Sequence, residues 1–266
     1  MMAALIIVVS LALSIAMAVA WLVQWRTHNA GWVDVVWSFS LGVAGVVYAL
    51  FPVPAGAPTV RQFLVAALAA CWSLRLGLHI AGRTRHGAED ARYEQFRREW
   101  GATFQLQMFW FLQIQAAAAA LLALTMLLAA RNPRPLSLFD AVGVVVLLIA
   151  VAGEAIADRQ LRQFRGDPVH RDGVCDLGVW GWSRHPNYFF EWLGWVAYPL
   201  FAIDPSGEYK WGWLAISAPL FMYCLLVHLS GIPPLEQHML RSRGNAFRKY
   251  QARVSAFFPV PPGWHS

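Results

Sequence analysis

The chain has 266 residues, of which 58% are hydrophobic and only 14% charged, and its mean hydropathy is +0.45. Because soluble proteins carry about 25% charged residues, so few charges cannot cover a soluble molecule of this size, whereas a lipid-facing surface needs none. The net charge of +6 is compatible with nucleic acid or anionic lipid, but cytosolic loops of a membrane protein explain it more simply. The composition therefore predicts a multi-pass helical membrane protein.

Seven apolar stretches are long enough, or nearly so, to cross a bilayer core of about 30 Å. They cover residues 3–23, 32–51, 60–82, 108–130, 138–157, 188–203 and 211–230, and the sixth is the shortest. The first has no Lys or Arg before its apolar run and no clear cleavage site, so we interpret it as a helix and not as a signal peptide. We expect one all-α membrane domain over 1–266, with a tail at 231–266 that is helical near 234–252.

The connections between these stretches differ in charge. Alternate connections at 24–31, 83–107, 158–187 and 231–266 hold sixteen Lys and Arg residues, and those at 52–59, 131–137 and 204–210 hold three. Positive residues collect on the cytosolic side of membrane proteins. The bias therefore predicts a cytosolic C-terminus, and it favours seven spans over six.

Ionisable residues inside membrane spans are costly and are functional candidates by default. Two sets repeat at helical spacing, which places each on one helix face: Arg75, His79, Arg83 and His86, and Glu154, Asp158, Arg162 and Arg165. Long side chains that extend from a helix end to the membrane surface could explain one such stripe. Two stripes favour a functional cavity.

The connections that follow these stripes, 83–101 and 158–192, are rich in Arg, Asp, His and aromatic residues. Guanidinium groups suit phosphate oxygens and aromatic faces suit a flat heterocycle, so a phosphorylated nucleotide cofactor fits better than a DNA groove. Asn187 and Glu191 are four residues apart and could bind a nicotinamide carboxamide, or could join two helices. The sequence lacks a G-x-G-x-x-G run, a P-loop and a Cys/His metal cluster, so we expect a helical cavity with no Rossmann sheet and no metal.

The run GVWGWSRHPNYFFEWLGWVAY at 178–198 resembles a signature of the membrane steroid 5α-reductase superfamily, and the chain resembles its bacterial DUF1295 branch. Supporting blocks are VDVVWSF at 33–39, RLGLHIAGRTRHGAEDARY at 75–93, DRQLRQFR at 158–165, and Glu236, Arg241 and Tyr250 in the tail. Related SRHPNY runs occur in sterol C14 and C24 reductases and in isoprenylcysteine carboxyl methyltransferases.

The resemblance implies NADPH-dependent reduction of the C4–C5 double bond of a 3-oxo-Δ4-steroid or a similar lipid enone. It implies a cofactor site built from Arg83, Asp158, Arg162, Arg165, Arg171, Asn187, Tyr188, Glu191, Glu236, Arg241 and Tyr250. The family's acidic position falls near Asp34, but its tyrosine position falls on Ile80. The candidate catalytic residues are therefore Asp34, His79, which is adjacent to Ile80, and Tyr93, which lies further along the chain.

A sterol C14- or C24-type reductase remains an alternative within the same chemistry, and two functions of other classes also remain open from the sequence. One is an S-adenosylmethionine-dependent methyltransferase, which the arginine excess disfavours because that cofactor has no phosphates. The other is a non-enzymatic lipid-binding protein, which leaves the charged stripes without a role. We expect a monomer in a bacterial inner membrane more than in the endoplasmic reticulum, with a sterol-like lipid as substrate and no nucleic-acid partner.

Overall fold

The computed structural model describes residues 1–52, 58–86, 91–170 and 173–261. The chain is 81% helical and the described residues contain no sheet, which confirms the all-α prediction. Six helices in the described part of the chain are long and apolar enough to cross a membrane. The shortest predicted span forms a helix of 17 residues and is not among the six. About seven membrane helices therefore remain the best description.

The helices follow the predicted spans closely, with extensions into the polar connections. In chain order they are α1 (Met2–Thr27), α2 (Gly31–Leu50), α3 (Val60–His86), α4 (Ala91–Trp100), η1 (Gly101–Thr103), α5 (Phe104–Ala130), α6 (Leu138–Gly166), η2 (Gly178–Gly181), α7 (Pro186–Ala202), η3 (Lys210–Ile216), α8 (Ser217–Tyr223), the π-helix η4 (Cys224–Leu229) and α9 (Ile232–Gln251).

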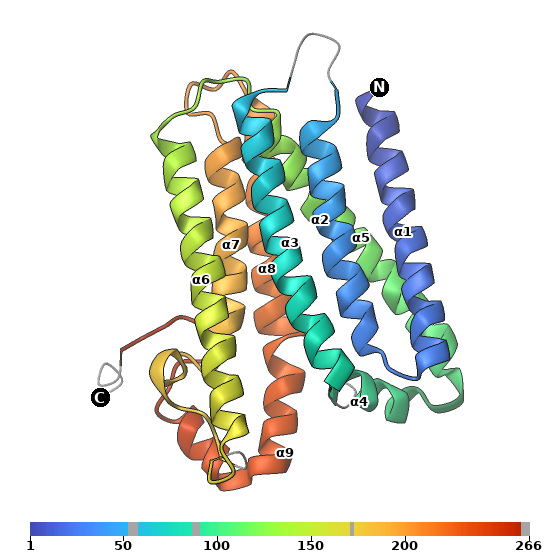
Figure 1. Ribbon diagram of the computed structural model, residues 1–266, viewed down its shortest axis with the longest axis vertical. Coiled ribbons are helices and arrows are strands. Elements are labelled where there is room, and N and C mark those ends of the chain that lie inside the picture. The colour runs from blue at the N-terminus through green and yellow to red at the C-terminus, as the bar shows by residue number, and fades with distance from the viewer. Residues whose placement is uncertain (53–57, 87–90, 171–172, 262–266) are drawn as a thin grey trace. The chain divides into compact units, whose positions relative to one another are not determined.

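Contacts group these elements into two compact units. Unit 1 holds residues 1–136 and 201–215, and unit 2 holds residues 137–200 and 216–266. In unit 1, α2 packs against α1, α3 and α5, and α1 also packs against α5. Figure 1 shows α1 and α2 side by side. The single membrane domain expected from the sequence stays a prediction.

The short helix α4 was not expected from the sequence, which predicts only a connection there. Its aromatic residues Tyr93, Phe96 and Trp100 recur at intervals of three and four, so they share one face. That face packs into a core cluster that includes Met17 and Met108. The polar residues of α4 occupy the remaining surface, so α4 is an amphipathic helix that covers part of unit 1.

Arg61 lies inside a predicted span and Arg131 lies in a connection on the side with few positive charges, and contacts in unit 1 explain both positions. Arg61 is 3% exposed, and its guanidinium donates to the backbone carbonyls of Asn132, Arg134 and Pro135. Arg131 donates to the carbonyl of Phe51 at 2.6 Å, just after α2 ends. Carbonyls at helix ends lack helical partners and attract cations. These arginines are therefore bound within the structure and do not argue against the predicted orientation.

In unit 2, α6 and α7 lie side by side (Figure 1). A Cβ atom on Gly153 of α6 would lie 2.4 Å from the Phe190 ring of α7, so only glycine lets these helices approach so closely. With 29 residues, α6 is about 43 Å long and exceeds a bilayer core of about 30 Å. Its last turns, which carry Arg162 and Arg165, therefore project beyond the apolar part of the helix.

The last stretch, Lys210–Gln251, has 42 residues, which is about twice the number that a bilayer core needs. Only its apolar part, predicted at 211–230, has the composition of a span. The helical hydrogen bonding changes in η4, and α9 begins after Ser230 and Gly231. Glycine also permits a bend inside α9, where Gly244 has a φ of 49°. We therefore treat α9 as lying outside the membrane-spanning part.

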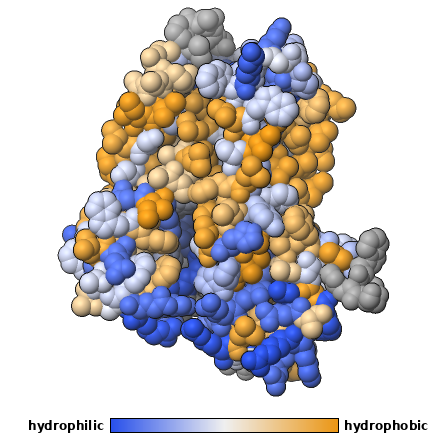
Figure 2. All heavy atoms as spheres, turned by 180° about the vertical axis from the view of Figure 1, so that it is seen from behind, coloured by the Kyte–Doolittle hydropathy of each residue, from blue (hydrophilic) through white to orange (hydrophobic). Residues whose placement is uncertain are grey.

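The molecular surface has the character expected of a protein in lipid. On α1, Ile7, Leu11 and Ile15 lie on one face and are 59%, 58% and 64% exposed. Hydrophobic side chains cover much of the face drawn in Figure 2. Large apolar patches of this kind need lipid or protein to cover them.

Candidate active site and cofactor pocket

Asp34 and Tyr93, two of the three candidate catalytic residues, are in direct contact in unit 1. The Tyr93 hydroxyl donates to Asp34 Oδ1 at 2.7 Å, and Arg92 Nη2 lies 2.8 Å from Asp34 Oδ2. Asp34 lies in the first turn of α2, where the helix dipole favours a negative charge. Tyr93 is 1% exposed and Asp34 retains 18% exposure of its side chain. The structure thus forms a carboxylate–tyrosine pair with a cation beside it.

His79 and Arg83 lie on α3, also in unit 1. His79 is half-buried and Arg83, one turn later, is exposed. They share one face of the helix, as their spacing predicts, and the helix extends one turn beyond the expected end at 82. His86 completes the predicted stripe, but its side chain lies outside the described residues.

The second predicted stripe lies in unit 2 on α6. Glu154 and Asp158 are buried, 6% and 7% exposed, whereas Arg162 and Arg165 are exposed. The charge of this face therefore changes from acidic to basic toward the polar end of the helix. The basic end is the part that can meet an anion from water.

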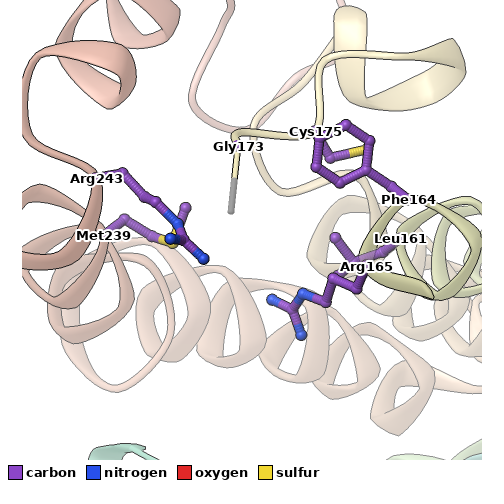
Figure 3. Close-up of a pocket in the computed structure, with 7 residues that line it drawn as sticks. All are labelled: Leu161, Phe164, Arg165, Gly173, Cys175, Met239 and Arg243. Atoms are coloured by element: carbon purple, nitrogen blue, oxygen red, sulfur yellow. The ribbon is translucent and has the colours of Figure 1, made fainter. Parts of the chain in front are cut away.

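A small, open pocket adjoins this basic end. Arg165 of α6 and Arg243 of α9 point into it from opposite sides (Figure 3). Its other lining residues are Leu161, Phe164, Gly173, Cys175 and Met239. Burial raises the pKa of the Cys175 thiol, so this group is uncharged. The lining combines two guanidinium groups with apolar walls and no carboxylate, which suits a phosphate attached to a flat or apolar group.

The start of α7 carries Asn187, Tyr188 and Glu191. Glu191 Oε1 accepts a hydrogen bond from Trp195 Nε1 at 2.9 Å, within the same helix. The Tyr188 ring stacks on His185, with centroids 5.5 Å apart and planes 13° apart. Asn187, Tyr188 and Glu191 are each partly exposed. They retain surface that a ligand could contact.

Glu236 of α9 lies in a closed network with the residues just before α7. Arg184 holds both of its oxygens, with Nε 2.7 Å from Oε1 and Nη2 3.3 Å from Oε2. His185 Nε2 lies 2.9 Å from Oε1, and Gln251 Nε2 donates to Oε2 at 2.7 Å. Burial raises the pKa of Glu236, but these hydrogen bonds and the Arg184 charge outweigh it and hold the pKa at about 2.

The same network binds the C-terminal segment to the start of α7. Arg184 Nη1 donates to the carbonyl of Val254 at 2.6 Å, and its backbone N–H donates to the carbonyl of Ser255 at 2.8 Å. The Ser183 hydroxyl donates to the carbonyl of Phe257 at 2.9 Å. The Tyr250 hydroxyl donates to the carbonyl of Trp180 at 2.6 Å. We call the paired segments 182–185 and 254–260 the tail clasp.

Comparison with known proteins now identifies the family. The family model described as "Protein of unknown function (DUF1295)" matches residues 20–254, which is most of the chain. The chain belongs to the DUF1295 family. This family is steroid 5α-reductase-like, as the sequence resemblance indicates.

The DUF1295 chain is also similar to a protein of a yeast. It is an uncharacterized protein of Schizosaccharomyces pombe, 26% identical over 273 residues, which cover 92% of this chain and 77% of that protein. No solved structure matches the chain significantly. The similarity reaches a eukaryotic protein, so the predicted bacterial inner-membrane location stays a prediction.

The remaining predicted cofactor residues of this DUF1295 protein differ in their surroundings. Glu236 and Tyr250 are engaged in the internal bonds described above, which gives both a structural role. Arg241 is exposed on α9. Arg171 lies outside the described residues. The cofactor role of all four stays a prediction.

Three arginines of these sites, Arg92, Arg184 and Arg243, were not among the predicted site residues. Arg92 and Arg184 acquire their roles from carboxylates 58 and 52 residues away, a distance that no helical spacing reveals. Arg243 had a usable signal, because Met239 and Arg243 are four residues apart on one face of α9 and both line the pocket. The same pattern would have favoured Arg243 over Arg241.

Proposed function

We propose that this protein reduces the carbon–carbon double bond of a 3-oxo-Δ4-steroid or a similar lipid enone with NADPH. The observation that carries the proposal is the pocket with two arginines, in a member of a steroid 5α-reductase-like family. Each guanidinium group can donate two parallel hydrogen bonds to phosphate oxygens, and the Phe164 ring is a flat surface for a heterocycle. An S-adenosylmethionine site would not need two arginines, so the pocket favours NADPH.

In this proposal the pocket residues bind and orient the dinucleotide. Arg165 and Arg243 hold a phosphate group between them, while Leu161, Phe164 and Met239 exclude water from the apolar side. When bound, NADPH supplies the hydride that adds to the β-carbon of the enone. Asn187 and Glu191, one turn apart at the start of α7, are the polar groups we assign to the carboxamide end.

Negative charge develops on the ketone oxygen as the double bond is reduced. A hydrogen-bond donor placed at that oxygen lowers the barrier, and removing one such donor typically costs about 10²–10³ in rate. We assign this donor to the Tyr93 hydroxyl. Its single proton is donated to Asp34 Oδ1 at 2.7 Å, so it would have to turn to the ketone oxygen when the enone binds and leave Asp34 paired with Arg92. A proton then adds to the α-carbon, and His79 is the remaining candidate for its delivery. Arg92 keeps the Asp34 carboxylate neutralised throughout.

The proposal is tested by NADPH consumption in the purified protein. A Δ4-3-keto steroid or another enone from a broad panel should accelerate the loss of NADPH absorbance, and the product should carry a saturated ring bond by mass spectrometry. Failure to turn over any enone in the panel would contradict the proposed reaction.

Cofactor binding is tested separately with pocket variants. Arg165→Ala or Arg243→Ala should weaken NADPH binding roughly tenfold to a hundredfold, because each removes a charge-assisted contact of about 1.5–3 kcal/mol. Arg159→Ala is the matched control, since this exposed arginine lies on α6 and does not line the pocket. Equal NADPH affinity in all three variants and the wild type would reject the pocket as the cofactor site.

We further propose that the natural substrate is a membrane-soluble, sterol-like or isoprenoid enone, because the protein is embedded in lipid. The charge bias supports a cytosolic C-terminus, and with this orientation the pocket would face the side where NADPH is made. Cysteine accessibility to an impermeant reagent, with a cysteine introduced at exposed Arg248, tests this orientation in intact cells.

A further inference from the structure

His185 is a buried ionisable group that the proposed reaction does not use. Its side chain is 4% exposed, although it immediately precedes α7 and the residues assigned to the cofactor. One face of its ring lies against Tyr188, with a centroid separation of 5.5 Å and an interplanar angle of 13°. Its Nε2 lies 2.9 Å from Glu236 Oε1. The imidazole therefore connects the internal carboxylate of α9 to an aromatic ring at the start of α7.

The orientation of this imidazole is set by groups behind it. Glu236 is itself held by Arg184 and Gln251, so the carboxylate offers one fixed acceptor position to the ring. Burial lowers the pKa of His185 more than Glu236 raises it, so the ring is neutral near pH 7. A carboxylate can only accept, so in the neutral ring the proton resides on Nε2. One tautomer and one ring plane follow from these contacts.

We propose that His185 is a positioning residue for Tyr188, and that the Arg184–Glu236–His185 network thereby fixes the aromatic ring that NADPH meets at the start of α7. The inference rests on the proposed function, since Tyr188 is among the residues assigned to the cofactor. A side chain that is ordered before binding loses less conformational entropy when the ligand arrives. The network therefore acts on cofactor affinity and not on the chemical step.

Two substitutions at this position separate the face of the ring from its hydrogen bond. His185→Gln keeps an N–H donor near the Nε2 position and removes the flat face. His185→Phe keeps the flat face and removes the donor, while Glu236 retains Arg184 and Gln251. A stacked aromatic pair contributes about 0.5–1.5 kcal/mol, which corresponds to roughly a two- to tenfold change in affinity. His185→Gln should weaken NADPH binding by that factor, and His185→Phe should stay within about twofold of the wild type.

The decisive measurement is a double-mutant cycle on the NADPH dissociation constant. If His185 acts through Tyr188, His185→Gln should cause no further loss in a Tyr188→Ala background. At saturating NADPH the kcat for enone reduction should be unchanged, so the effect appears in KM alone. His228→Gln is the matched control, because His228 also has a ring contact with a tyrosine, at 5.6 Å from Tyr223. Thermal unfolding in detergent reports any purely structural effect of each substitution.

The possible outcomes separate this inference from the proposed function. Coupled effects of His185→Gln and Tyr188→Ala, with near-normal binding by His185→Phe, support the positioning role. Additive effects, or an equal loss in His185→Gln and His185→Phe, overturn it while NADPH binding by the wild type leaves the proposed function intact. Absence of NADPH binding by the wild type overturns the proposed function and this inference with it.

Discussion

The contact between Tyr93 and Asp34 leads to a sharp prediction for Tyr93→Phe. The substitution removes one oxygen atom from a side chain that is 1% exposed and leaves its ring in the core cluster of unit 1. The lost hydrogen bond, 2.7 Å long, goes to a charged group, so it is worth about 1.5–3 kcal/mol. Arg92 still pairs with Asp34 at 2.8 Å, which places the expected loss of folding stability at the lower end of that range.

The effect on turnover should be larger than the effect on stability. If the Tyr93 hydroxyl donates to the ketone oxygen, kcat should fall about 10²–10³-fold, or about 3–4 kcal/mol of transition-state stabilisation. NADPH affinity should be unchanged, because the two pocket arginines lie on α6 and α9. The assay is NADPH consumption at saturating cofactor and enone, together with thermal unfolding in detergent.

A matched deletion in the same unit provides the control. Tyr209→Phe also removes one hydroxyl, which donates to the carbonyl of Leu128 at 3.1 Å. It should cost about 0.5–1.5 kcal/mol of stability and leave kcat unchanged. If Tyr93→Phe turns over enone within threefold of the wild type while losing the expected stability, Tyr93 is a structural partner of Asp34 and the donor lies elsewhere.

Two further predictions concern unit 2. Because the pKa of Glu236 is held at about 2, below its ordinary value of about 4.3, its contribution to stability is complete above that ordinary value and is lost as the pH falls toward 2. Glu236→Gln should therefore lose up to about 3 kcal/mol of the free energy of unfolding near pH 7, relative to the wild type. This difference should shrink between about pH 5 and pH 2. A difference in thermal unfolding that does not change with pH would refute the assignment. Gly153→Leu should separate α6 from α7, since even a Cβ atom would lie 2.4 Å from Phe190, and we expect a loss of about 1–3 kcal/mol or more. Gly82→Leu is the control, because a Cβ there meets no atom within 4 Å, and equal melting temperatures in the two variants would contradict the close packing.

The sequence was most informative where one helix contains the whole signal. Apolar length located the membrane helices, and spacing placed Glu154, Asp158, Arg162 and Arg165 on one face of α6. The predicted span ends at 157 because the apolar run stops there, and α6 continues to 166 through polar residues that are good helix formers, as the spacing of Asp158, Arg162 and Arg165 predicts. The short helix α4 was not predicted because most of its residues are polar or charged. Only the spacing of its three aromatic residues indicates a helix with one apolar face.

Contacts between distant segments could not be derived from the sequence. Nothing in the spacing of Asp34 and Tyr93 requires a hydrogen bond across 59 residues. Nor does the SRHPNY run indicate that Ser183 and His185 are buried against the tail and Glu236 while Asn187 and Tyr188 remain partly exposed. Such divisions depend on which segments pack together, and one sequence carries little information about that packing.

The tail clasp also has a consequence for how the protein is made. Ser183 precedes its partner Phe257 by 74 residues. At a synthesis rate of about 5–20 residues per second, the start of α7 leaves the ribosome roughly 4–15 s before the segment that closes on it. During that interval Arg184 has no tail carbonyls and His185 has no Glu236 as partners, so both side chains need water or other polar groups around them. A nascent chain of this protein therefore enters the membrane with the region around Tyr188 unformed, and any ribosomal pause before residue 254 prolongs the period in which it is open to misfolding or proteolysis.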